Sequence, residues 1–279
     1  MLALDRMERA VVYSQARWRL LDTGVADGAT NMAIDEAILR AVAAGLALPT
    51  LRFFAWQPPC LSLGQAQSFA DVDWEACFER GYDVVRRPTG GRAILHMDEL
   101  TYSVAALEAE PRVAGGIVAS YRRLSEGLLD GLRRMGVPGV EAHHPEATRN
   151  SPSEPVCFES PSTYEITVAN KKLVGSAQVR RDGGVLQHGT LPLAGDIARI
   201  CDVLASRPDP VCVRARATTV ASVLGRPVSF QEAAEAIARG FSSALNLELA
   251  PGDLLLQERA WADELRRDRY AADEWNHRL

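Results

Sequence analysis

The chain has 279 residues, of which 47% are hydrophobic and 24% charged, and its formal net charge is −5. These values are typical of a globular protein with a full hydrophobic core, and the negative charge argues against general nucleic-acid binding. No apolar run is long enough to span a membrane and the N-terminal segment has no signal-peptide pattern, so we expect a cytoplasmic protein.

The five cysteines form no C-x-x-C pair and no zinc-finger spacing, a pattern that favours reduced thiols. Four of them follow or flank apolar residues and are predicted to pack in the core: Cys60, Cys77, Cys201 and Cys212. His143 and His144 are adjacent, but neither has a cysteine or acidic partner at ligand spacing. We therefore expect no metal and no bound cofactor.

Hydrophobic periodicity and turn residues predict alternating strands and helices in the first half of the chain. Strands are expected at 16–22, 51–56, 60–64, 82–87 and 100–106. Helices are expected at 30–44, at 70–80 with Asp71 as its N-cap, and at 116–135.

The second half predicts a hairpin of strands 164–168 and 172–180 around Ala169-Asn170, followed by a strand in 185–193. Further expected elements are a helix at 196–205, a helix opened by the capping box Ser229–Glu232 and reaching about residue 245, a short strand at 247–250 and a charged helix at 253–270. This mixture predicts the α/β (α+β) class, with a mixed, largely antiparallel sheet flanked by helices.

A loop rich in glycine, RRPTGGRAILH at residues 86–96, lies between two predicted strands. Its position between strands argues against a P-loop or a dinucleotide-binding turn, because both need a helix N-terminus. Paired Gly90 and Gly91 allow backbone N–H groups to approach a ligand closely. A plain hairpin turn explains the same residues.

The stretch from Cys157 to Leu191 contains the only two lysines in a chain with 29 arginines. Lys171 and Lys172 are adjacent, and chance placement in a turn is an ordinary explanation for both. A partly buried lysine can exchange a proton, whereas arginine keeps its own at biological pH. Lys172 is therefore the candidate for chemistry, with Cys157 upstream of it.

A cysteine thiolate next to a cation can attack an activated acyl carbon and form an acyl-enzyme. The lysine can then accept a proton from an incoming amine, while backbone N–H groups near Gly175-Ser176 or Gly90-Gly91 stabilise the oxyanion. From the residues alone, Cys157 is either this nucleophile or a buried structural cysteine.

Four motifs occur in the order found in the biotin/lipoate protein ligase superfamily: Asn31–Glu36, Arg86–Gly91 with His96, Lys172–Ala177 and His188-Gly189. Within that superfamily, CFESPSTYEI followed by KKLVGSAQ and LQHG resembles the octanoyltransferases of Gram-positive type. The resemblance covers about residues 16–275. It implies an N-terminal extension at 1–15, a catalytic domain at 16–250 and a C-terminal helical segment at 251–279 that packs on it.

The resemblance also implies roles for single residues. Cys157 matches the cysteine that carries the acyl thioester, and Lys172 matches the lysine that lowers the pKa of that thiol. Residues matching the substrate-binding walls are Arg86, Arg87, Thr89, Gly90, Gly91, His96, Gly175, Ser176, His188 and Gly189. The implied reaction moves an octanoyl group from octanoyl-acyl carrier protein to a lysine of a lipoyl-carrier domain, such as the glycine cleavage H protein.

Three other readings share parts of this pattern. ATP-dependent lipoate ligases have the same arginine-glycine and lysine motifs but do not need the cysteine. An amidotransferase that moves acyl groups between carrier domains does use a cysteine. A chain that only docks carrier domains has no need of an intact Cys157 and Lys172.

Carrier domains of this kind are generally acidic, and so is this chain, so docking requires a local basic face. Five arginines near the motif loops are expected to form it: Arg86, Arg87, Arg92, Arg180 and Arg181. Pairing with acidic side chains is the competing explanation for some of them.

Overall fold

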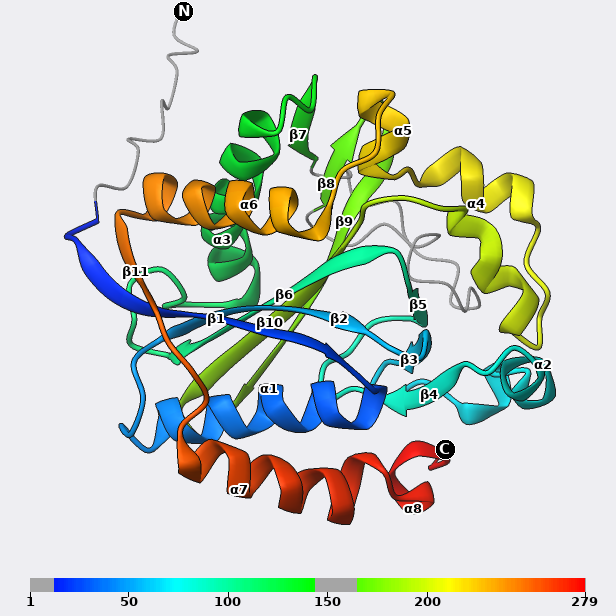
Figure 1. Ribbon diagram of the computed structural model, residues 1–279, viewed down its shortest axis with the longest axis horizontal. Helices are drawn as coiled ribbons and strands as arrows, with labels where there is room; N and C mark the ends of the chain where they lie inside the picture. The colour runs from blue at the N-terminus through cyan, green and yellow to red at the C-terminus, as the bar shows by residue number, and fades with distance from the viewer. Residues whose placement is uncertain (1–12, 144–164, 279) are drawn as a thin grey trace, which may run out of the picture.

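The computed structural model describes residues 13–143 and 165–278. An eight-stranded sheet forms the centre of the molecule, in the order β11-β1-β2-β6-β10-β9-β8-β7 (Figure 1). Its strands are β1 (Ala16–Ala26), β2 (Thr50–Trp56), β6 (Glu99–Leu107), β7 (Val140–His143), β8 (Glu165–Val168), β9 (Lys171–Arg181), β10 (Gly184–Pro192) and β11 (Leu247–Pro251). β1 is parallel to β11 and β2, and the other neighbours are antiparallel. The expected mixed, largely antiparallel sheet is confirmed.

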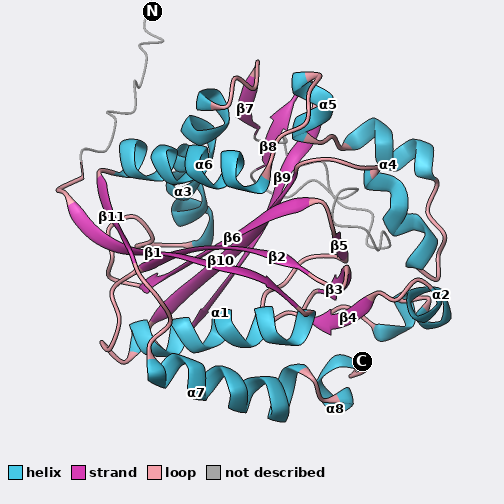
Figure 2. Cartoon of the chain, in the orientation of Figure 1, coloured by secondary structure: helices cyan, strands magenta, loops and turns pink. Residues whose placement is uncertain are grey.

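Helices cover both faces of this sheet (Figures 1 and 2). α1 (Gly28–Ala43) and α7 (Leu256–Leu265) lie on one face, and α3 (Ile117–Arg134) and α6 (Phe230–Leu245) on the other. Neighbouring residues of a strand point to opposite faces. Accordingly, Phe53 packs in the core under α3 and α6, whereas Phe54 packs in the core against α1.

A second sheet of three strands lies beside the first, in the order β4 (Asp83–Arg86), β3 (Cys60–Leu63) and β5 (Ile94–His96). It packs against α2 (Trp74–Glu79), the 3-10 helix η2 (Ile197–Val203) and α4 (Pro210–Arg216) to form a third core. β4 and β5 both pair with β3. The loop at 86–96 between them is therefore not a hairpin turn, because the strands that it joins are not neighbours.

Several expected elements differ in detail. The segment 70–80 is a 3-10 turn, η1 (Phe69–Asp71), followed by the short helix α2. The expected N-cap Asp71 is wrong: the cap is Asp73, whose side chain accepts a hydrogen bond from the N–H of Ala76. The expected helix at 196–205 is the 3-10 helix η2.

The C-terminal third also contains elements that the pattern missed. α4 and α5 (Val220–Leu224) are short, although Asp209 before Pro210 is a standard start signal for α4. The expected helix at 253–270 is α7 followed by a π turn, η3 (Arg266–Tyr270), and a separate α8 (Asp273–Asn276). The domain boundaries at residues 15 and 250 stay a prediction.

The cysteines outside the stretch around Cys157 follow the expectation with one exception. Cys60, Cys77 and Cys201 are buried, whereas Cys212 is exposed on α4, so its assignment to the core was wrong. Across residues 13–143 and 165–278 no helix is long and apolar enough to cross a membrane. The same residues contain no cluster of three potential metal ligands, and His144 lies outside them.

Close contact between α3 and α6 depends on three glycines. A Cβ placed on Gly240 of α6 would lie 2.3 Å from the carbonyl oxygen of Gly127 and 2.3 Å from the nitrogen of Gly131, both on α3. A Cβ on Gly131 would lie 2.7 Å from the Cα of Ile237. The two helix backbones therefore approach more closely than any side chain allows.

This contact gives a stability prediction. Gly240→Ala should lower the free energy of unfolding by about 1 to 2 kcal/mol, because an overpacking cost of up to about 3 kcal/mol exceeds the gain of about 1 kcal/mol in helix propensity. Gly116→Ala is the control, because nothing lies within 4 Å of its added Cβ. Urea titration measures both, and equal midpoints for the two variants would contradict the prediction.

Candidate active site

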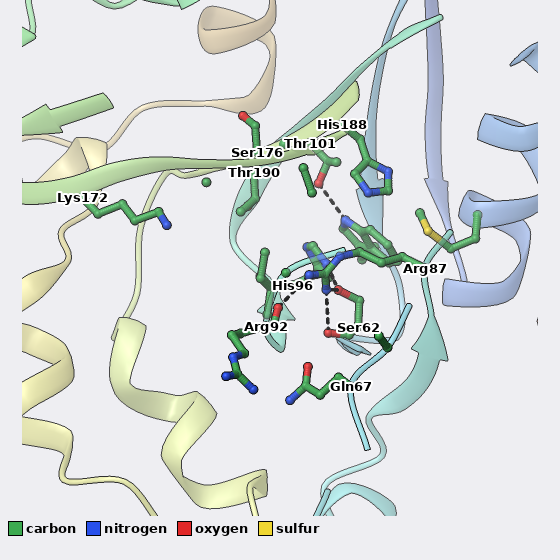
Figure 3. Close-up of a pocket in the computed structure, with 18 residues that line it drawn as sticks. Ser62, Gln67, Arg87, Arg92, His96, Thr101, Lys172, Ser176, His188 and Thr190 are labelled. Carbon is green, nitrogen blue, oxygen red and sulfur yellow. Dashed lines mark hydrogen bonds between the residues drawn. The ribbon is translucent and has the colours of Figure 1, made fainter. Parts of the chain in front are cut away.

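A cavity of about 420 Å³ lies between the two sheets (Figure 3), a volume within the range of roughly 300–1,000 Å³ usual for small-molecule sites. Strands β2, β6, β9 and β10 of the large sheet and β3 and β5 of the small sheet contribute to its wall, as do α1 and the loop after β4. The lining residues are Met32, Trp56, Ser62, Ala66, Gln67, Arg87, Gly91, Arg92, Ile94, His96, Thr101, Lys172, Gly175, Ser176, Ala177, His188, Gly189 and Thr190.

Lys172 points into this cavity from β9 (Figure 3) and is only 4% exposed. Its Nζ donates a 2.7 Å hydrogen bond to Oε1 of Glu165, the first residue of β8. This charge-assisted bond fixes the direction of the ammonium group. Cys157 lies outside the described residues, so its approach to Lys172 stays a prediction.

His188 of β10 takes part in a buried polar chain. Its Nδ1 lies 3.1 Å from Oδ2 of Asp35 on α1, and its Nε2 lies 2.7 Å from Oγ1 of Thr89 in the loop after β4. Asp35 accepts further bonds from Arg52 at 2.6 Å and from Ser103 at 2.7 Å. These hydrogen bonds join α1, β2, β6, β10 and the loop after β4 at one point.

For both Asp35 and His188, burial and neighbouring charges shift the pKa in opposite directions. Burial would raise the pKa of Asp35, but Arg52 and the hydrogen-bond donors around it hold this pKa below its usual value. Burial lowers the pKa of His188 despite the neighbouring Asp35. We therefore assign a neutral imidazole whose Nδ1–H donates to Asp35 and whose Nε2 accepts from the Thr89 hydroxyl.

His96 of β5 forms a similar chain on the opposite wall. Its Nε2 lies 2.8 Å from Oγ of Ser62, and its Nδ1 lies 2.7 Å from Oε1 of Glu99. The ring stacks on Trp56 with centroids 4.0 Å apart and planes within 11°. Trp56 is itself fixed by a 2.7 Å bond from its Nε1 to Oγ1 of Thr101. This wall of the cavity is therefore rigid.

The loop after β4 is held by Arg87. Its guanidinium donates to the backbone oxygens of Ser62 at 3.0 Å, Gly90 at 2.8 Å and Arg92 at 2.7 Å. Gly91 has φ +95°, a conformation that favours glycine. Arg87 and Gly91 line the cavity, whereas Thr89 and Gly90 do not, and Thr89 contributes through His188.

The side of the cavity formed by the paired strands β9 and β10 is lined by Gly175, Ser176 and Gly189. The Oγ of Ser176 lies 2.7 Å from the Tyr102 hydroxyl, which also accepts a 2.9 Å bond from Nε2 of Gln187. A Cβ on Gly189 would lie 2.5 Å from that Ser176 oxygen. Glycine at 189 therefore leaves room for the hydrogen bond between Ser176 and Tyr102.

The sequence of this chain is similar to that of a known protein family. Residues 27–242, most of the chain, match the lipoyl protein ligase A/B catalytic domain. The chain belongs to this family. Octanoyltransferase LipM of Kyrpidia tusciae is 46% identical over 271 residues, which span 94% of this chain and 98% of the relative. LipM of Moorella thermoacetica is 46% identical over 265 residues, spanning 92% and 97%.

Solved structures agree with the family. The bi-partite lipoate protein ligase of Thermoplasma acidophilum has a TM-score of 0.76 at 26% identity, covering 94% of this chain and 96% of that one. A lipoate-protein ligase A bound with ATP has a TM-score of 0.77 at 27% identity, covering 95% and 99%. The expected superfamily, fold class and octanoyltransferase class are confirmed.

Arg86 has a different place from the one expected. It does not line the cavity: its buried guanidinium donates to the backbone oxygens of Gly64 at 3.0 Å, Trp275 at 3.1 Å and Asn276 at 2.9 Å. It therefore ties the C-terminal segment to the loop after β3. Its assignment to the substrate-binding wall is wrong because the strand places its side chain on the outer face of the small sheet, against α8.

The five arginines of the expected basic docking face do not lie together on one exposed surface, and the docking of carrier domains stays a prediction. Arg86 and Arg87 are buried, and Arg180 and Arg181 are at the far end of β9, about 26 Å from Lys172 at roughly 3.3 Å per residue. Arg180 donates to the backbone oxygen of Val113, and Arg181 pairs with Glu36 on α1. Only Arg87 and Arg92 remain at the cavity.

Sequence reasoning missed the partner of Lys172. Thr167 on β8 is directly opposite Lys172, which makes Glu165, two residues earlier, its diagonal neighbour on the same face. The predicted hairpin therefore contained the signal for this ion pair. Ser62 is likewise a diagonal neighbour of His96, because Cys60 on β3 pairs with His96, and Glu99 lies three residues further along the chain. The stacking of Trp56 on His96 had no such signal, because it depends on how the two sheets meet.

The lowered pKa of His188 predicts that stability falls with acidity. As pH drops through about 6.5, the unfolded chain gains a proton that the buried ring does not, so the unfolding free energy falls by at most about 1.4 kcal/mol per pH unit. His188→Gln should reduce this slope between pH 7.5 and 5.5 in urea titrations. His277→Gln, on a partly exposed histidine, is the control. Equal slopes for wild type and His188→Gln would contradict the prediction.

Proposed function

We propose that this chain, in the cytoplasm, transfers an octanoyl group from octanoyl-acyl carrier protein to a lysine of a lipoyl-carrier domain, such as the glycine cleavage H protein. Cys157 carries the group as a thioester between the two steps. The observation that supports this most is the buried Lys172 at the cavity, whose ammonium group Glu165 holds. The 46% identity to octanoyltransferase LipM supports the choice of acyl group.

In the first step the Cys157 thiolate attacks the thioester carbonyl of the donor, and the thiolate of the carrier protein leaves. In the second step the acceptor lysine attacks the new thioester, an amide forms and the Cys157 thiolate leaves. The carrier thiolate that leaves in the first step takes a proton from the Lys172 ammonium group. Neutral Lys172 then takes the proton that the attacking amine loses in the second step and returns to its charged form. Thioester is exchanged for thioester and then for amide, so no nucleotide is consumed.

The cavity suits the alkyl part of this substrate. Met32, Trp56 and Ile94 supply apolar surface, while the polar groups of His96 and His188 are directed towards Glu99, Ser62, Asp35 and Thr89. An acyl chain therefore meets few polar atoms that lack a partner. Residues 16–250 form the catalytic domain in this proposal, with 251–279 packed on it and 1–15 as an extension.

An ATP-dependent lipoate ligase is the second candidate, because the solved relative that binds ATP has the same fold at 27% identity. That reaction activates free lipoate as an acyl-adenylate and leaves Cys157 without a chemical role. Transfer between two carrier domains is a variant of the first proposal, with a different donor. The presence or absence of an ATP requirement separates the two candidates.

The deciding measurement is intact mass after mixing the protein with octanoyl-acyl carrier protein without ATP. Wild type should gain one octanoyl group that hydroxylamine removes, and Cys157→Ala should gain none. Lys172→Arg should fail to pass the group on, because arginine cannot accept the proton. Acyl-adenylate formation from lipoate and ATP, with no adduct in their absence, would establish the ligase instead.

The ion pair of Lys172 gives a further prediction. Glu165→Gln keeps the shape but replaces the charge-assisted bond with a neutral one, so the second step should slow by about 10- to 100-fold as Lys172 loses its fixed position. Single-turnover transfer from the isolated acyl-enzyme measures this step. Glu141→Gln, on an exposed residue of the neighbouring strand β7, should leave it unchanged. An unaltered rate in Glu165→Gln would remove Glu165 from the mechanism.

A further inference from the structure

The order of the strands defines the two ends of the cavity. Lys172 enters from β9, whereas Trp56 closes the wall from β2, and β10 and β6 lie between those strands. Three strand spacings correspond to roughly 14 Å. If the acyl carbonyl lies at Lys172, as the proposed octanoyl transfer requires, the alkyl chain extends from β9 towards β2.

The far end of the cavity has one fixed wall and one adaptable wall. Trp56 is fixed by its bond to Thr101 and its stacking on His96. Met32 is the adaptable one: it lines the cavity from α1, is 1% exposed and shares a core cluster with Trp56. A methionine side chain is flexible and fills irregular space well.

The position of Met32 beside Trp56 is built into the chain. The amide of Asn31 donates to the backbone oxygens of Ala26 and Ala55, at 3.1 and 3.0 Å, and so ties the first turn of α1 to the ends of β1 and β2. Asp35, one turn further along α1, binds His188. Met32 is therefore held between the end of β2 and the imidazole on β10.

We propose that Met32, backed by Trp56, sets the maximum length of the acyl chain. An extended octanoyl group spans roughly 9 Å from carbonyl to methyl, from seven bonds of roughly 1.5 Å that follow a zigzag. That length fits the separation of β9 and β2 once the side chains of Lys172 and Trp56 occupy part of it. A longer chain has to displace the Met32 side chain.

The test compares acyl-carrier thioesters of eight, ten and twelve carbons. Met32→Ala removes three heavy atoms at the far end, so the ratio of kcat/KM for twelve carbons to that for eight should rise about ten-fold or more, since one methylene in an apolar pocket is worth roughly 10- to 200-fold. Met32→Val is the milder variant if Met32→Ala does not fold. Met135→Ala, at the buried C-terminal end of α3 in the other core cluster, is the matched control and should leave the ratio unchanged.

Binding of free octanoate, decanoate and dodecanoate, measured by calorimetry, gives the same ratio without any transfer. If the wild type transfers octanoyl groups and Met32→Ala has the same ratio as the wild type, the role of Met32 is overturned and the proposed function stands. If the wild type forms no acyl adduct, the proposed function is overturned. The ratio of binding affinities then tests the role of Met32 by itself. A shifted ratio supports the inference in either assay, and an unshifted binding ratio overturns it.

Discussion

The buried pair of Asp35 and Arg52 is the interaction on which the site depends. Both side chains are fully buried, and such a pair persists only where further hydrogen bonds satisfy each partner. Here Arg52 also donates to the backbone and side-chain oxygens of Asn31 and stacks over Phe54. Removing either charge would leave the other buried without compensation, at a cost of about 3–5 kcal/mol. The pair therefore holds α1 on the sheet and sets the position of His188.

Hydrogen bonds position the side chains of the cavity wall, beginning at Asp35 of this pair. Asp35 orients His188, which reaches Thr89, and Glu99 orients His96, which reaches Ser62. In both chains a carboxylate fixes one ring nitrogen and a hydroxyl satisfies the other. Both ring nitrogens of each histidine are thus satisfied within the wall, while Lys172 brings its ammonium group into the cavity from the other end.

The sequence predicted features that local physics decides. Ser229 caps α6 by accepting the N–H of Glu232, and Ala169 and Asn170 both have positive φ, as a tight hairpin between β8 and β9 needs. The motif arginines show where such reasoning ends. Arg86 and Arg87 are adjacent, yet one ties down the C-terminus and the other holds the cavity loop. Which neighbour faces which side depends on the packing of the small sheet, and no local pattern records that.

The unequal use of arginine and lysine has a physical explanation in this structure. Arg52, Arg86 and Arg112 are among the largest fully buried side chains, and each donates to several oxygens that connect segments far apart in sequence. A planar guanidinium with five donors and a permanent charge suits that work. It cannot release a proton, so it cannot serve where a group must alternate between charged and neutral forms. Lys172, in the cavity and bonded to Glu165, can exchange a proton, as the proposed transfer requires.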